Sequence, residues 1–168
     1  MPHGFLVALL AALFALPLAH AAEPAFAEPR TGLHTGGQPD ERQLESFAAQ
    51  GVRTVIDLRG ADEARGYDEK AVAARLRLRY VGLPIAGAGA LTAANAAALK
   101  QALAASDGPV LLHCASGNRV GALLALMAST REGMDAESAL ALGRRAGLKS
   151  LEPVVREKLG LPPAEPVP

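Results

Sequence analysis

One stretch decides the fold, Val110-Leu111-Leu112-His113-Cys114-Ala115-Ser116-Gly117-Asn118-Arg119-Val120-Gly121. Residues 110–113 form a short apolar run that predicts a buried strand. Residues 120–128 are apolar on all sides, which predicts a central, buried helix. A tight loop between a strand and a helix directs successive backbone N–H groups into one concavity, where the helix dipole adds positive potential. The stretch therefore predicts an anion-binding loop.

Three residues give this loop its chemistry. Gly117 permits a positive φ where the loop must curl inward. Arg119 offers a planar fork of donors that can hold a tetrahedral oxyanion by two bonds. Helix N-termini and nearby cations stabilise thiolates, so we expect Cys114 to be an activated nucleophile beside the anion site. It is the chain's only cysteine, so it has no partner for a disulfide within the chain.

Outward from this loop, strand-like and helix-like segments alternate. Residues 52–58 and 78–84 read as strands, and residues 61–76 could be helical. Helices are predicted after the capping residues Asp40, Thr92 and Asp135, with a final helix ending near Leu159. The alternation predicts an α/β single domain, with a central, mostly parallel sheet flanked by helices and the Cys loop between a strand and a buried helix.

The carboxyl ends of parallel strands meet at one edge of a sheet, where ligands bind. We therefore expect Asp57-Leu58-Arg59 to meet the segment that begins at His113.

The N-terminus has the features of an export signal. Residues 5–18 form an apolar run that is short for a membrane span, and Ala19-His20-Ala21 suits a signal peptidase. We predict a signal peptide over residues 1–21, an irregular leader over 22–30, the folded domain over 31–160 and a proline-rich tail over 161–168. The mature protein is then periplasmic or secreted, with no stable membrane insertion.

The charge balance argues against polyanionic partners. Lys+Arg and Asp+Glu are equal at 17 each, so no global field recruits nucleic acid. Half of the residues are hydrophobic, which suits a chain that buries a core. The composition favours an enzyme or a small-ligand binder over a nucleic-acid-binding protein.

His113-Cys114, the small loop and Arg119 resemble the active-site loop of the protein tyrosine phosphatase superfamily. Together with Gly37-Gln38-Pro39 and residues 51–59, they resemble the small bacterial dual-specificity-like phosphatases, particularly the β-lactamase-hydrolase-like phosphatase domains. The resemblance covers residues 30–148 and implies hydrolysis of phosphomonoesters. It implies a cysteinyl-phosphate on Cys114, a loop oriented by His113, and a phosphoryl group bound by Ala115, Ser116, Gly117, Asn118 and Arg119. No metal or cofactor is implied, and the substrate would be a phosphorylated small molecule or a phosphoprotein.

Three features depart from that family's pattern. Four residues separate Cys114 from Arg119 instead of five, and four is typical of rhodanese-type sulfurtransferases. Val120 replaces the usual hydroxyl after the arginine, a role that Ser116 could take. The loop that normally carries the general acid, residues 84–92, contains no acidic residue. The remaining candidates for that acid are Asp57, Asp62, Glu63, Asp68, Glu69 and Asp107.

Two alternatives to phosphatase activity stay open at this stage. One is a sulfurtransferase that carries a persulfide on Cys114. The other is a module that binds phosphate or sulfate without turnover. A second helix, predicted after the helix of the Cys loop, favours the phosphatase over the rhodanese arrangement.

Overall fold

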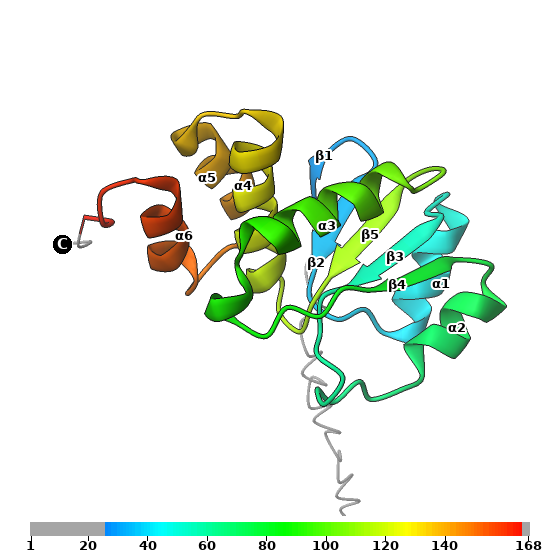
Figure 1. Cartoon of the computed structure of the whole chain (residues 1–168). Coiled ribbons are helices and arrows are strands. Elements are labelled where there is room, and N and C mark those ends of the chain that lie inside the picture. The colour runs from blue at the N-terminus through cyan, green and yellow to red at the C-terminus, as the bar shows by residue number, and fades with distance from the viewer. Residues whose placement is uncertain (1–25, 166–168) are drawn as a thin grey trace, which may run out of the picture.

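A computed structural model describes residues 26–165, and Figure 1 gives the arrangement of the elements. In chain order they are β1 (Ala27–Arg30), β2 (Leu33–Gly36), α1 (Glu41–Ala49), β3 (Thr54–Asp57), α2 (Glu69–Arg75), β4 (Arg79–Gly82), the 3-10 turn η1 (Ala88–Ala90), α3 (Ala93–Ala104), β5 (Val110–His113), α4 (Asn118–Glu132), α5 (Ala136–Arg145) and α6 (Glu152–Leu159). Within the described residues, no helix is both long and apolar enough to cross a membrane.

The strands form one sheet in the order β1-β2-β5-β3-β4. All neighbours are parallel except β1 and β2, so the predicted α/β domain with a mostly parallel sheet is confirmed. β5 lies in the centre, and its last residue His113 is in register with Gly36 on one side and Asp57 on the other. The carboxyl ends of β2, β3 and β5 therefore meet where the Cys loop begins, as the sequence predicts.

Helices cover both faces of the sheet (Figure 1). Val55 and Leu111 point to one face and pack with α1 and α2, while Ile56 and Leu112 point to the other and pack with α3, α4 and α5. This alternation follows from the period of two in a strand. Every residue from 120 to 128 is buried, which confirms α4 as the central helix.

The predicted caps are present. Asp40 accepts from the backbone N–H of Gln43, and the Gln43 side chain accepts from the Asp40 N–H, which completes a capping box. The side chains of Thr92 and Asp135 cap α3 and α5 by accepting from the backbone N–H groups of Asn95 and Ser138, respectively.

The prediction of an irregular leader over residues 22–30 is wrong for its last part. Residues 27–30 form β1, an antiparallel edge strand, so the domain begins before residue 31. Pro29 argues against a strand in the sequence, because proline lacks a backbone N–H, but proline is tolerated in an edge strand. The Phe26 ring packs edge-on against Phe47, with ring centroids 4.9 Å apart, and so ties this segment to α1.

Two further predictions concern the helix within residues 61–76 and the signal peptide. The helix expected within residues 61–76 is confined to α2, because residues 60–68 form a loop. The predicted signal peptide lies outside the described residues and stays a prediction.

Candidate active site

Cys114 begins a tight loop between β5 and α4. Its side chain is fully buried, and the backbone N–H of Gly117 points at Sγ with a nitrogen–sulfur distance of 3.2 Å. Gly117 has a φ of +84°, the left-handed conformation that was predicted for it, and it directly precedes the first residue of α4. The loop thus turns backbone donors inward around the sulfur at the N-terminus of a buried helix, an arrangement suited to an anion.

The outer side of the loop is tied to the segment after β2. Gly37 and Ser116 form an isolated antiparallel bridge. The Gln38 N–H donates to the Ala115 carbonyl at 3.3 Å. Ala115 and Ser116 are exposed at the mouth of the loop. These backbone contacts fix the rim of the loop, where the side chains of Ala115 and Ser116 are exposed.

Asn118 uses its side chain differently from its neighbours in the loop. Its Oδ1 accepts from the backbone N–H groups of Lys149 and Leu151 at 2.8 and 3.3 Å, and its Nδ2 donates to the Ser150 hydroxyl at 2.7 Å. The side chain therefore fastens the α5–α6 connection to the loop. Any contribution of Asn118 to anion binding comes from its backbone N–H.

Arg119 is held by Glu63, which lies on the loop between β3 and α2. Nη1 and Nη2 donate to the two carboxylate oxygens at 2.5 and 2.6 Å, and Nη1 also donates to the Ile85 carbonyl at 3.0 Å. The hydrogen bonds from Arg119 lower the pKa of Glu63 to about 2, despite partial burial, with help from the Gly60 N–H. Glu63 is therefore ionised at neutral pH.

One edge of the Arg119 guanidinium remains for a ligand. Of its five N–H donors, Glu63 and Ile85 take three, and Nε–H and one Nη2–H have no oxygen partner in the described part of the chain. These two donors share one edge, the fork that binds phosphate by two parallel bonds. The pKa of Arg119 is raised mainly by the bond to Glu63, and the adjacent Cys114 contributes to the shift.

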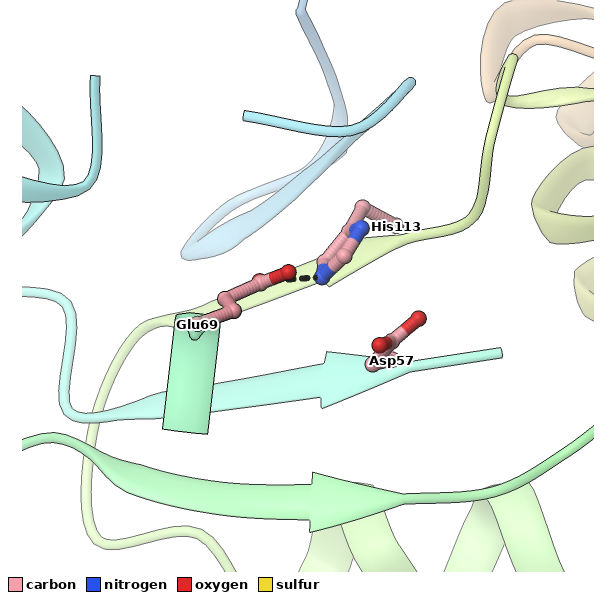
Figure 2. Close-up of side chains that lie close together, drawn as sticks. All are labelled: Asp57, Glu69 and His113. Atoms are coloured by element: carbon pink, nitrogen blue, oxygen red, sulfur yellow. Dashed lines mark ion pairs between the residues drawn. The ribbon is translucent and has the colours of Figure 1, made fainter. Parts of the chain in front are cut away.

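Behind the loop lies a buried cluster of charged side chains, part of which Figure 2 shows. Arg59 donates to both Asp57 oxygens at 2.9 Å and also to Glu69, and all three side chains are buried. The Glu69 carboxylate reaches the Nε2 of His113 at 2.7 Å, and the Nδ1 of this ring lies 3.4 Å from the Cys114 carbonyl oxygen. The cluster thus reaches Cys114, the first residue of the Cys loop.

The charged groups of the cluster show whether it is an ion-pair network or a metal site. Burial alone would raise the pKa of Asp57, but hydrogen bonds from Arg59, the charge of His113 and a hydrogen bond from Tyr80 bring it down to about 2. Asp57, Glu69 and His113 offer ligand atoms within 4.8 Å of one another, the spacing of a metal site. Because Arg59 already bonds to both carboxylates, the set fits an ion-pair network better than a cation site.

The structure distinguishes the general-acid candidates by their partners and positions. Asp57 and Glu63 are paired with arginines, and Glu69 is paired with Arg59 and contacts His113. Asp68 caps α2, and Asp107 lies in the turn before β5, at the opposite edge of the sheet. Asp62 is exposed next to Glu63 and, like the distant Asp107, has no such partner in the described chain.

Sequence reasoning missed the role of Glu63 and Glu69 as partners of Arg119 and His113. Both glutamates were considered only as proton donors. Their position shortly after Asp57-Leu58-Arg59 in the sequence is the available signal, because that segment is expected to meet the Cys loop.

Solved structures share this architecture. A protein of Neisseria meningitidis proposed to be a phosphatase aligns with a TM-score of 0.66 at 17% identity, covering 79% of this chain and 96% of that one. TpbA of P. aeruginosa aligns with a TM-score of 0.60 at 23% identity, covering 76% of this chain and 78% of TpbA. A Cys-to-Ser variant of TpbA was crystallised in complex with phosphotyrosine. At these identities the likeness shows a shared fold.

Sequence comparison reaches further. The chain is 36% identical over 119 residues to a β-lactamase hydrolase-like protein of Xylella fastidiosa, and 33% identical over 98 residues to one of Agrobacterium fabrum. The matches cover 68% and 56% of this chain but only 27% and 22% of those relatives, so the chain spans about a quarter of their length. A sequence model of the family described as DSP-PTPase phosphatase fused to NAD+ kinase matches residues 13–153, and the chain belongs to this phosphatase family.

Proposed function

We propose that the chain is a cysteine-dependent phosphomonoester hydrolase. The observation that carries this proposal is the approach of the Gly117 N–H to the Cys114 sulfur, close to Arg119, which has two donors without an oxygen partner among the described residues. A nucleophile and an oxyanion fork on one loop are what phosphoryl transfer to a thiolate requires.

The reaction follows from these positions. The Cys114 thiolate attacks phosphorus, a sulfur–phosphorus bond forms, and the bond to the leaving oxygen breaks. Arg119 and the loop N–H groups stabilise the charge on the transferring phosphoryl oxygens. A water molecule then attacks the cysteinyl-phosphate, which releases inorganic phosphate and restores the thiolate. The leaving oxygen takes up one proton in the first step.

We propose Asp62 as the donor of that proton. It is exposed on the loop that holds Arg119, whereas the other acids are paired, capping a helix or distant. General acid catalysis contributes about 10²–10⁴-fold and matters most for poor leaving groups. Asp62→Asn should therefore slow hydrolysis of an alkyl phosphate far more than that of an activated aryl phosphate. An equal loss on both substrates would remove Asp62 from this role.

Steady-state hydrolysis of an aryl phosphate by the reduced chain tests the main proposal. We expect turnover that Cys114→Ser abolishes and that Arg119→Lys reduces strongly, because lysine lacks the planar fork. Competitive inhibition by vanadate or tungstate should weaken in Arg119→Lys as well.

Sulfur transfer is the second candidate, and the four-residue spacing between Cys114 and Arg119 is the observation that favours it. Against it stands α5, a helix that directly follows α4 along the chain. Persulfide on the purified protein, with sulfur transfer to cyanide and no phosphate release, would replace the phosphatase proposal by this one.

A further inference from the structure

Residues 59–69 contact the Cys loop at two separate points. Arg59 and Glu69 stand at the two ends of this segment and meet inside the buried cluster. Glu63, from its middle, holds Arg119. Arg65 braces the loop between them by donating to the backbone carbonyls of Gly60, Ala61 and Glu63 at 3.0 to 3.2 Å. One segment therefore touches both ends of the catalytic loop.

The contact at the beginning of the catalytic loop is made through His113. The Glu69 carboxylate lies 2.7 Å from Nε2 of the His113 ring (Figure 2). The Cys114 carbonyl oxygen lies 3.4 Å from Nδ1. The contact with Glu69 is short but is not aligned as a hydrogen bond, and both atoms are buried. An oxygen atom therefore lies close to each of the two ring nitrogens, and the second oxygen belongs to the nucleophile's own residue.

Stability alone is a poor explanation for this cluster. Buried ion pairs recover the cost of desolvation only in part, and apolar residues of similar volume often stabilise a protein as well or better. The cluster also sits at the point where β3 and β5 end, with Asp57 in register with His113. Its position behind the nucleophile points to a role in the shape of the catalytic loop.

We propose that Glu69 is a positioning residue of the catalytic loop, acting through His113, with Arg59 holding Glu69 in place. This inference rests on the proposed phosphatase function for its kinetic arm. The Glu69 carboxylate sets the orientation of the imidazole, and the imidazole sets the Cys114 carbonyl from which the loop starts. Loss of the carboxylate misplaces the sulfur relative to the Arg119 edge.

A double-mutant cycle tests the route through His113. Glu69→Gln is made in the natural chain and in His113→Asn, and both kcat for an aryl phosphate and the rate of Cys114 alkylation by iodoacetamide are measured. We expect kcat and the alkylation rate to fall about tenfold with KM nearly unchanged, the lower range for losing a partner that orients a functional histidine. In His113→Asn, Glu69→Gln should change both quantities less than about twofold, since contacting residues are not additive.

Two controls separate positioning from general damage. Glu45→Gln is the matched exposed control on α1 and should leave both readouts unchanged. Asp57→Asn removes a carboxylate of the same cluster that forms its ion pairs with Arg59 and Arg65 and none with His113 among the described residues, and it should lower thermal stability with a smaller loss of alkylation rate. Equal losses in both His113 backgrounds, or a rise in KM at constant kcat, would overturn the proposal.

The experiment keeps its meaning in two difficult cases. If Glu69→Gln does not fold, His113→Gln tests the same route and must lower the alkylation rate; an unchanged rate refutes the proposal. If the natural chain hydrolyses no phosphate, the phosphatase proposal fails, yet alkylation of Cys114 still reports on its position. In that case the proposal still requires that Glu69→Gln lowers the rate of Cys114 alkylation.

Discussion

Glu63 and Arg119 are joined by two parallel hydrogen bonds across 56 residues of sequence, with nitrogen–oxygen distances of 2.5 and 2.6 Å. The arginine side chain is 14% exposed and the glutamate 34%. Fork-to-fork pairing fixes the guanidinium plane, which an isolated surface pair would not do. The pair therefore fixes the orientation of the remaining Arg119 donors, Nε–H and one Nη2–H, before any ligand binds.

Replacing Glu63 tests this presetting. Glu63→Gln keeps the size of the side chain but removes its charge and one acceptor oxygen, so Arg119 loses its fixed plane. We expect the inhibition constant for tungstate to rise about tenfold, the loss of roughly 1.4 kcal/mol of charge-assisted bonding. Inhibition kinetics on an aryl phosphate measure it.

A matched control exists at the far end of α4. Arg30 and Glu132 form the same two-bond pair, at 3.1 and 2.6 Å, away from the catalytic loop. Glu132→Gln should leave tungstate inhibition unchanged. Tighter tungstate binding in Glu63→Gln would mean that Glu63 competes with the ligand for Arg119 instead of presetting it.

Acid should unfold the protein partly through Asp57. The folded pKa of this buried carboxyl, about 2, lies below its ordinary 3.8, so the stabilisation is present above pH 4 and lost as the pH falls toward 2. The difference corresponds to about 2 kcal/mol. Urea unfolding at neutral pH and near pH 3 should show less loss of stability on acidification in Asp57→Asn than in the natural chain. Identical pH dependence in the two proteins would contradict the assignment.

Gly121 should not tolerate alanine, although it lies inside α4. Helix propensity alone favours alanine by up to about 1 kcal/mol. A Cβ on Gly121 would overlap the Leu148 backbone nitrogen and the Gly143 carbonyl oxygen, where α5 and the segment after it cross α4. We expect a loss of about 2–3 kcal/mol from this overpacking, read from chemical unfolding. Gly82→Ala, which meets no atom within 4 Å, serves as the control and should stay within about 0.5 kcal/mol.

Asn118→Ala should affect folding more than catalysis. The side chain's three hydrogen bonds hold residues 149–151, and their loss should lower stability by about 1–2 kcal/mol. Its kcat/KM should fall less than that of Arg119→Ala, because the backbone N–H of residue 118 is retained. Unchanged thermal stability with a loss of kcat/KM as large as in Arg119→Ala would place the side chain in the substrate site.

The parts of the fold that could be predicted have strong local signals. The β-branched run of β3, the all-round apolar α4 and the capping residues Asp40, Thr92 and Asp135 each specify their element locally. β1 and β2 lacked such a signal. Each strand has only four residues. β1 contains Pro29, and β2 has the polar residues His34 and Thr35 next to each other, so only pairing with neighbouring strands defines these two elements.

The candidate site also has features that the sequence predicts and contacts that it does not predict. The inward turn at Gly117 and the meeting of Asp57 with His113 follow from local sequence and from sheet topology. The pairing of Arg119 with Glu63, and of His113 with Glu69, joins residues far apart in sequence. No spacing rule predicts such contacts, so the roles of Glu63, on the loop after β3, and of Glu69, at the start of α2, became evident only with the structure.

The most direct measurement is the mass of the Cys114 peptide after rapid acid quench of the reduced chain with an aryl phosphate. The account predicts one added phosphoryl group on Cys114 of the natural chain and none on Cys114→Ser. In Asp62→Asn this cysteinyl-phosphate accumulates only if its hydrolysis becomes slower than its formation. Phosphate release by a folded chain that never carries phosphate on Cys114, or that continues in Cys114→Ser, would contradict it.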